Sequence, residues 1–171
     1  PPRSTLSSSS AASDVYKRQL PGDTNSLNNL FGGELLARMD KVASIAAIKH
    51  SEQIVVTASI NNVAFGDPVP NGSILTIEAK VSRAFNTSME VFIDVWKQNK
   101  THKKKTKVNE SIYTFVAVTK SGETIKVPPL IPETELEKKR FDAALRRRQL
   151  SLVLAGKMKA NEATELKAIF D

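Results

Sequence analysis

The chain has 171 residues, and its 25 basic against 18 acidic side chains give a net charge of +7 at pH 7. This length suits one domain with a single core. The chain has no cysteine, which excludes disulfides, a thiol nucleophile and thiolate metal sites, and its two separated histidines, His50 and His102, disfavour a histidine-based metal centre. We expect a reducing, cytoplasmic setting, and no apolar run is long enough to span a membrane.

The positive charge favours an anionic partner. Nucleic acid, an anionic membrane surface and a small ligand that carries phosphates all satisfy this condition. Charge alone does not choose among them.

Residues 1–19 are rich in serine and contain no apolar block. They match neither a secretory leader nor a packed element, so we expect disorder. The segment also resembles the read-through of a sequencing adapter, which predicts a non-native leader in the place of the true N-terminus.

Residues 20–130 show the pattern of one helix followed by four strands. Apolar side chains cover most of residues 34–48, which predicts a largely buried helix. Alternating or β-branched residues predict the strands, which we place at residues 53–65, 73–85, 88–97 and 108–119. Asn86-Thr87 is the turn of a hairpin between the second and third strands. Phe92, Trp96 and Phe115 lie on these strands and are interpreted as core residues, with a role in an acyl channel as the alternative.

Residues 131–171 form a charged helical extension in this interpretation. Pro128, Pro129 and Pro132 indicate a stiff linker, and a charged helix then runs to about Leu154, with Thr134 or Glu133 near its cap. A short helix could follow to Phe170. Since little else is apolar, the economical packing is an antiparallel sheet wrapped around the one apolar helix, which is an α+β fold.

The polar run that begins at Asp23 leads through Gly32-Gly33 into the apolar helix. Free backbone N–H groups and the macrodipole at a helix N-terminus stabilise an oxygen that gains negative charge, and glycine lets a ligand approach closely. This arrangement is suited to ester cleavage. The alternative is that the glycine pair serves only a turn or packing.

Several separated motifs within residues 20–145 resemble those of hotdog-fold acyl-CoA thioesterases, most closely the brain-type acyl-CoA hydrolases and their bacterial relatives. The motifs are Asp-Thr-Asn at 23–25, Asn-Asn-Leu-Phe-Gly-Gly at 28–33, Met-Asp at 39–40, Thr-Ser-Met-Glu-Val at 87–91 and Ile-Pro-Glu-Thr-Glu-Leu-Glu-Lys-Lys-Arg-Phe at 131–141. The resemblance implies hydrolysis of acyl-CoA to a free fatty acid and coenzyme A, without a metal or bound cofactor. It also implies a homodimer with sites between two hotdog subunits, assembled into a homohexamer. Such a subunit has a strand before its helix, where this chain has the serine-rich leader, so we expect the first strand to be missing.

The resemblance places the catalytic amide at Asn29 of one subunit and the catalytic acid at Asp23 of its neighbour, with Gly32 and Gly33 as the oxyanion stabilisers. Asp23 would accept the proton of water, and Asn29 would position the water or the carbonyl. Asp40 stands where another thioesterase branch has its acid, and is the alternate. The alternative is a purely structural role, in which Asp23 and Asn29 are turn or cap residues and Asp40 belongs to a buried polar network at a dimer interface.

Coenzyme A phosphates require basic or polar partners, for which we select Arg83, Asn86, Thr87 and Ser88. The basic residues of 97–107 and 146–148 are further candidates, with a solvated surface as the alternative for either run. Ser88 is a poor nucleophile candidate because no nucleophile-elbow pattern surrounds it, so attack by water is favoured.

A different class of function stays open. A catalytically inactive hotdog domain could bind acyl-CoA, or could bind RNA or another polyanion through residues 138–148. Its affinity for nucleic acid would then depend on the salt concentration. The sequence lacks an aromatic and basic stacking platform for RNA, so we expect no specific nucleic-acid partner.

Overall fold

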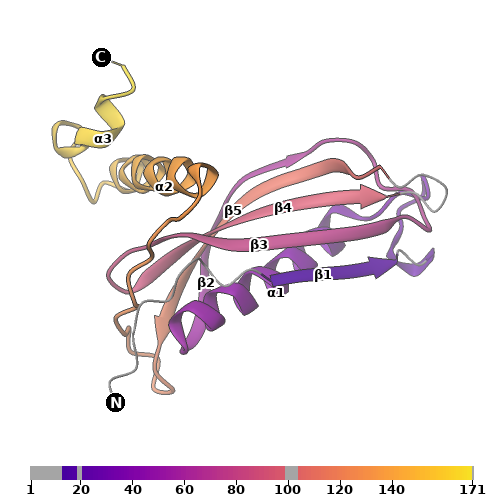
Figure 1. Cartoon of the computed structure of the whole chain (residues 1–171), viewed down its shortest axis with the longest axis horizontal. Coiled ribbons are helices and arrows are strands. Elements are labelled where there is room, and N and C mark those ends of the chain that lie inside the picture. Colours follow the sequence, from indigo (N-terminus) through magenta and orange to yellow (C-terminus); the bar gives the residue numbers. More distant parts are fainter. Residues whose placement is uncertain (1–12, 19–20, 99–103, 171) are drawn as a thin grey trace.

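The computed structural model describes residues 13–18, 21–98 and 104–170. Five strands form one antiparallel sheet in the order β1-β3-β4-β5-β2. The strands are β1 (Ser13–Arg18), β2 (Ile54–Phe65), β3 (Ile74–Ala84), β4 (Ser88–Gln98) and β5 (Thr106–Val118), and the helices are α1 (Gly32–Ser51), α2 (Glu135–Leu154) and α3 (Thr164–Lys167). The predicted hairpin is therefore confirmed as β3 and β4 (Figure 1).

Helix α1 lies along one face of the sheet and forms the core with it (Figure 1). Period-two alternation turns every second side chain of the central strands toward this helix. The largest fully buried side chains include Met39 of α1 and, on the sheet, Leu75, Met89, Ile93, Tyr113 and Phe115. The predicted α+β architecture, a sheet around one helix, is confirmed, and so is the core position of Phe115.

Strand β2 is one edge of the sheet, and most of its side chains are exposed. Ile54, Val56, Ile60 and Phe65 are 43–56% exposed, and Ile45 and Ile48 of α1 are 40% and 45% exposed. The prediction of a largely buried helix is wrong on this side, because a single sheet covers only one part of the wide apolar face of α1. Exposed apolar side chains on an unpaired edge strand are typical of a surface that receives a partner.

Strand β1 corrects the expectation of a disordered leader and a missing first strand. Ser13 to Arg18 pair antiparallel with β3, from Ser13 opposite Ala79 to Arg18 opposite Ile74. An edge strand gains its main-chain hydrogen bonds from the open edge of β3 and needs no apolar block for this purpose. The rest of the predicted leader, residues 1–12 and 19, and residues 99–103 of the basic loop lie outside the described residues.

Helix α2 packs on the sheet face opposite α1. It begins with Thr134 as its N-cap, one of the two predicted cap residues, in a capping box: Thr134 Oγ1 accepts a hydrogen bond from the Glu137 N–H at 3.2 Å, and Glu137 Oε2 accepts one from the Thr134 N–H at 3.0 Å. The Arg147 guanidinium binds the buried Glu90 carboxylate at 2.9 and 2.7 Å, and Arg140 binds Asp94 at 2.7 Å. Ion pairs therefore attach α2 to a polar sheet face.

No helix within the described ranges is long and apolar enough to cross a membrane.

Candidate active site

The loop before α1 is held by backbone hydrogen bonds on both sides. The Phe31 N–H donates to the Asp23 carbonyl at 3.0 Å, and the Leu30 N–H donates to the Val69 carbonyl at 2.8 Å. Asn28 adopts a left-handed φ of 56°, which asparagine tolerates better than most residues. These contacts give the loop one defined shape at the helix N-terminus.

Asn25 organises this loop from within. Its Oδ1 accepts hydrogen bonds from the N–H groups of Leu27, at 2.9 Å, and Asn29, at 3.2 Å. With the oxygen used in this way, the side-chain nitrogen of Asn25 is the donor that it can offer to a ligand. Asn25 belongs to the Asp-Thr-Asn motif at 23–25 but was not among the predicted site residues. Its position three residues after a proline–glycine turn and ahead of the helix resembled an ordinary turn residue.

The N-terminus of α1 is open. Its N-cap, Phe31, makes no side-chain cap hydrogen bond, and the first N–H groups of a helix have no acceptor within the helix. Gly33 is exposed, and a Cβ built there meets nothing within 4 Å, whereas a Cβ at Gly32 would lie 3.3 Å from Cζ of Phe65. The structure therefore leaves the Cβ side of Gly33 open at this helix end.

A cavity of about 260 Å³ lies beside this helix end. It is lined by Asn25, Asn29, Leu30, Gly32, Leu35, Phe65, Gly66, Asp67, Pro68, Val69 and Val108. The structure therefore brings Asn29 and Gly32, two of the predicted site residues, to one small cavity together with Asn25.

Asp23 faces a different group. Its carboxylate Oδ2 forms an ion pair with Nη2 of Arg38 at 2.8 Å, and the two side chains are 19% and 11% exposed. Arg38 belongs to α1, so the pair fastens the loop to the second turn of the helix. Within one chain, this contact gives Asp23 a structural role that differs from the general base predicted for it.

Asp40 lies on the side of α1 that carries Gly33. Seven residues separate the two, which is nearly two full helical turns, so Asp40 lies about 10 Å further along the axis. Its Oδ1 accepts a hydrogen bond from Oγ1 of Thr57 on β2 at 2.7 Å. Burial and, to a smaller extent, the nearby Asp40 charge raise the pKa of Tyr113 to about 12. The alternate acid is thus a half-buried carboxylate at the exposed β2 edge.

The predicted coenzyme A residues lie at the other end of the sheet. The Ser73 N–H, just before β3, donates a hydrogen bond to the Pro70 carbonyl next to the site loop, whereas Arg83 is the last residue but one of the same 11-residue strand, roughly 30 Å away. Nη1 of Arg83 donates to the Phe141 carbonyl at 2.9 Å, its guanidinium lies over the Phe141 ring at 4.0 Å, and burial lowers its pKa. Ser88 is buried and accepts a hydrogen bond from Nη1 of Arg148 at 3.3 Å.

Asn86 is exposed and Thr87 is half-buried in the turn that follows β3. One chain therefore does not bring any of the four predicted coenzyme A residues to the Gly32–Gly33 end. Arg83 and Ser88 instead contact α2, a use that local sequence patterns do not reveal.

A metal centre of three or more histidine, aspartate or glutamate side chains is not formed in the part of the chain that the structure describes. The expectation that the protein needs no metal or bound cofactor stays a prediction.

Comparison with known proteins identifies the fold and the family. Residues 27–103 match the family model described as Thioesterase superfamily. A Bacillus subtilis protein named uncharacterized acyl-CoA thioester hydrolase YkhA is 37% identical over 130 residues, which are 76% of each chain. The crystal structure of an apo-hexameric acyl-CoA thioesterase matches with a TM-score of 0.82 and 37% identity, covering 85% of this chain and 94% of that one.

An acyl-CoA hydrolase from Staphylococcus aureus, solved in complex with butyryl coenzyme A, coenzyme A and coenzyme A disulfide, is also similar. It matches with a TM-score of 0.79 and 33% identity, over 93% of this chain and 96% of that one. The same hydrolase has been solved as three variants, in which an aspartate, a threonine or an asparagine is replaced by alanine.

An antiparallel sheet around one helix is the hotdog fold, and the matches to thioesterases give the class of protein. The chain belongs to the acyl-CoA thioester hydrolases of the thioesterase superfamily. The predictions of the fold, the family and the enzyme class are confirmed at this level. The roles of the individual site residues stay predictions, because the comparisons do not test them.

Proposed function

We propose that the protein hydrolyses acyl-CoA thioesters to a carboxylic acid and coenzyme A at a site shared by two protomers. The observation that carries this proposal is the Asp40–Thr57 pair. It places a carboxylate at the uncovered β2 edge, on the same helix face as an open N-terminus. The butyryl coenzyme A bound to the similar Staphylococcus enzyme supports the substrate class.

A single chain cannot use both groups on one substrate. A general base must lie within hydrogen-bond reach of the attacking water, or one water away. The Gly33 N–H and the Asp40 carboxylate of the same helix are separated by about 10 Å along its axis. The carbonyl held by one helix N-terminus therefore requires the Asp40 of a second protomer.

The β2 edge provides the two-fold contact for this arrangement. It is a 12-residue edge strand with exposed apolar side chains, and it can pair antiparallel with the same strand of a second copy. Such pairing reverses the partner's α1 relative to its own, so each Asp40 lies beside the other protomer's helix. This supports the predicted homodimer as the minimal active unit.

The chemistry then follows from these groups. The thioester oxygen accepts a hydrogen bond from the Gly33 N–H, with Gly32 and the amide of Asn25 or Asn29 beside it. Asp40 takes one proton from water as the new C–O bond forms, and Thr57 holds the carboxylate in place. The tetrahedral intermediate collapses with breakage of the C–S bond, and the coenzyme A sulfur leaves as a thiolate that acquires a proton.

The spacing of the altered residues in the Staphylococcus enzyme supports this choice. Its aspartate and threonine lie as far apart in sequence as Asp40 and Thr57 do here. Its asparagine precedes that aspartate by the same interval that separates Asn25 from Asp40. We therefore assign the proton transfer to Asp40 rather than Asp23, and keep Asp23 as a positioning residue through Arg38. Asn29 stays a predicted amide donor.

The hexameric state of a solved neighbour supports a homohexamer of three dimers for this chain. We further propose that the reaction needs no bound metal or cofactor and that the protein works in the cytoplasm. The nucleotide part of coenzyme A would reach Asn86 and Thr87 only from the partner protomer, whose sheet runs in the opposite direction. Nucleic-acid binding by the basic tail is expected to be weak and independent of sequence.

The test is hydrolysis of acyl-CoAs with short, medium and long chains, followed by reaction of the released thiol with a chromogenic reagent. We expect Asp40→Asn to abolish most turnover with the dimer intact, and Asn25→Ala to lower it strongly. Asp23→Asn should act mainly on stability, and Asp142→Asn, an exposed carboxyl on α2, is the matched control. No turnover of any acyl-CoA by the folded oligomer would overturn the proposal and favour the silent binding module.

A further inference from the structure

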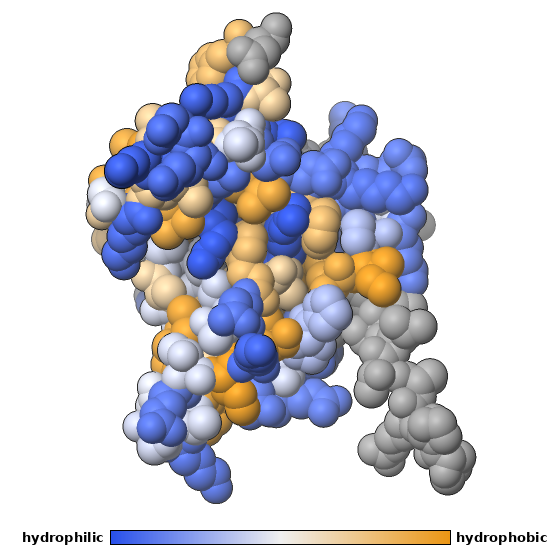
Figure 2. Space-filling model, turned by 90° about the vertical axis from the view of Figure 1, so that its left-hand side faces the viewer, coloured by the Kyte–Doolittle hydropathy of each residue, from blue (hydrophilic) through white to orange (hydrophobic). Residues whose placement is uncertain are grey.

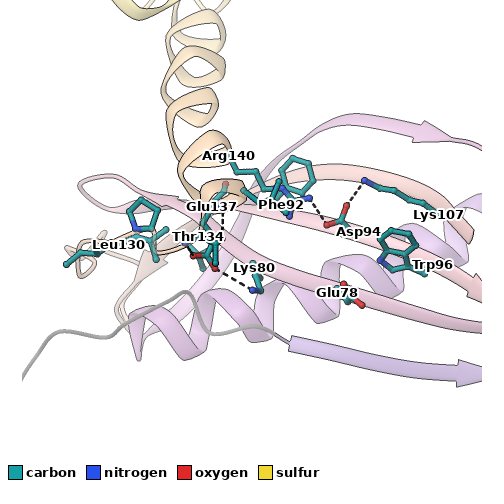
Figure 3. A pocket seen from close by; sticks show the side chains of 15 residues that line it. Glu78, Lys80, Phe92, Asp94, Trp96, Lys107, Leu130, Thr134, Glu137 and Arg140 are labelled. Carbon is teal, nitrogen blue, oxygen red and sulfur yellow. Dashed lines mark hydrogen bonds and ion pairs between the residues drawn. The ribbon is translucent and has the colours of Figure 1, made fainter. Parts of the chain in front are cut away.

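A second cavity, of about 390 Å³, lies under the start of α2 on the sheet face opposite α1 (Figure 3). Its apolar lining consists of Val81, Phe92, Trp96, Leu130, Ile131, Pro132 and Leu136. Ile131 and Leu136 are 51% and 58% exposed. The groove is therefore open to solvent along an apolar rim.

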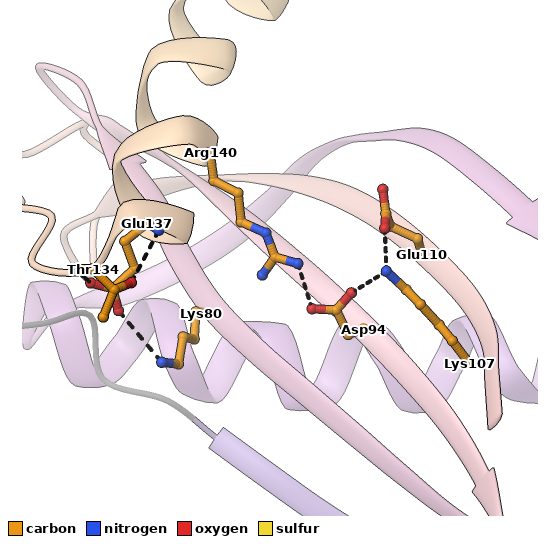
Figure 4. A network of polar contacts seen from close by, with 7 residues as sticks. All are labelled: Lys80, Asp94, Lys107, Glu110, Thr134, Glu137 and Arg140. Atoms are coloured by element: carbon orange, nitrogen blue, oxygen red, sulfur yellow. Dashed lines mark hydrogen bonds and ion pairs between the residues drawn. The ribbon is translucent and has the colours of Figure 1, made fainter. Parts of the chain in front are cut away.

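Five of the six charged side chains that line this groove are paired with one another. Asp94 accepts a hydrogen bond from Arg140 at 2.7 Å and forms an ion pair with Lys107 at 2.6 Å, and Nζ of Lys80 lies 3.5 Å from Oε1 of Glu137 (Figure 4). Burial alone would lower the pKa of Lys107, but hydrogen bonds to Asp94 and Glu110 outweigh it, so that pKa is raised. The lining holds three carboxylates, including Glu78, and three cations, so an added ion of either sign meets no net opposite charge. The groove thus suits a neutral apolar group rather than a charged ligand.

The indole N–H of Trp96 requires a hydrogen-bond acceptor. Its indole nitrogen Nε1 is buried, and the described residues offer it no hydrogen-bond acceptor. The indole lies among the groove-lining side chains in Figure 3. A buried N–H without an acceptor is costly, so the natural occupant is expected to supply an oxygen.

The same chain carries an apolar segment that its own fold leaves uncovered. Helix α3 is held against α2, where the Leu166 N–H donates to Oε1 of Gln149 at 2.9 Å. The following Ile169 and Phe170 are 57% and 84% exposed. Figure 1 shows α3 beyond α2 and away from the sheet, and Figure 2 shows the C-terminal end projecting above the rest of that side. The last carbonyls of such a helix end have no helical donor, so they are available as acceptors.

The Trp96 groove suits an occupant with an apolar group and an oxygen. The segment Ile169–Phe170 offers both, but it lies on a different part of the chain. Contacts of this kind are heterologous and close into rings when the rotation allows it. The β2 edge can build only two-fold dimers, so a hexamer needs a second contact. We propose that Ile169 and Phe170 of one protomer dock into the Trp96 groove of a protomer in the next dimer, and that this contact closes the ring of three dimers. This inference rests on the hexamer of the proposed function.

The experiment measures mass by light scattering together with the fluorescence of Trp96, the single tryptophan of the chain. We expect Phe170→Glu and, separately, Leu136→Glu to reduce the particle mass to one third, from hexamer to dimer. Phe170→Glu should also shift the Trp96 emission to longer wavelength. Phe170→Leu should restore the hexamer, and Lys126→Ala, an exposed residue with the same change in net charge, should leave it intact.

Circular dichroism checks that each variant is folded, and both substituted side chains are exposed in one chain. A wild-type protein that is dimeric at assay concentration would overturn the inference, as would hexamers of Phe170→Glu with unchanged Trp96 emission. A Trp96 response to a neutral long-chain alcohol that is the same in wild type and Phe170→Glu would assign the groove to a lipid instead. Acyl-CoA hydrolysis by the variant dimers separates the proposed active site from the proposed contact between dimers. Their activity tests the site at the two-fold interface, and their mass tests the contact of Ile169 and Phe170.

Discussion

Oγ1 of Thr57 donates a hydrogen bond to Oδ1 of Asp40 at 2.7 Å, and this contact joins the edge strand β2 to helix α1. The contact fixes the orientation of the carboxylate and leaves its second oxygen as the proton acceptor. Because β2 is the edge at which we place the dimer contact, the pair lies beside the partner protomer. The geometry thus connects assembly to catalysis.

We expect Asp40→Asn to lower kcat/KM by about 10²–10⁴, the usual contribution of a general base. Thr57→Val should lower it by roughly tenfold, since the base is then present but poorly oriented, and Thr57→Ser should restore it. The double variant should be no slower than Asp40→Asn alone, because the hydroxyl acts only through the carboxylate. Losses that multiply in steady-state kinetics would contradict this coupling.

Local patterns predicted much of the fold. The cap at Thr134, the turn at Asn86-Thr87 and the start of α1, predicted at Glu34 and found at Gly32, depend on residues close together in sequence. Strand β1 was missed because its pairing with β3 depends on the open edge of a distant strand.

The candidate site was only partly predictable for the same reason. The helix N-terminus was recognised from its glycines, but Arg83 and Ser88 were assigned to coenzyme A although they pack under α2. Alternation along a strand tells which side chains share a face, but it does not tell which distant helix covers that face. The hydrogen bonds of Asn25 and the pairing of Asp40 with Thr57 likewise appear only in three dimensions.

Gly33 provides a test in which stability and activity move in opposite directions. A Cβ at this position meets nothing, so Gly33→Ala should stabilise the helix by about 0.5–1 kcal/mol. The added methyl group obstructs the approach of the thioester to the N–H, so kcat/KM should fall. Thermal unfolding and hydrolysis measured on one sample check both effects, and an unchanged kcat/KM would remove Gly33 from the oxyanion site.

Arg147 tests the attachment of α2. It binds both oxygens of Glu90, a side chain 6% exposed that also accepts from Oγ of Ser82 at 2.5 Å. Arg147→Met leaves this carboxylate buried without its cation, which should cost about 2–3 kcal/mol, less than for a fully buried pair because Arg147 is partly exposed. Adding Glu90→Gln should recover part of the loss in urea unfolding. A double variant as unstable as the sum of the two single ones would show that the pair is not coupled.

Glu137 controls how the capping box responds to acid. The backbone N–H groups of Thr134 and Glu133 hold the pKa of Glu137 below its usual range, with a further contribution from Lys80. A carboxyl whose pKa is lowered on folding stabilises the protein above its unfolded value of about 4.3, and this stabilisation is lost as the pH falls through the folded value. Glu137→Gln keeps the oxygen acceptor but not the charge. The Tm of wild type should therefore exceed that of the variant above pH ~5, and the two should converge in stronger acid. Glu123→Gln, on the β5 side of the molecule, is the control, and a Tm difference between wild type and Glu137→Gln that persists unchanged into strong acid would exclude the charge as its cause.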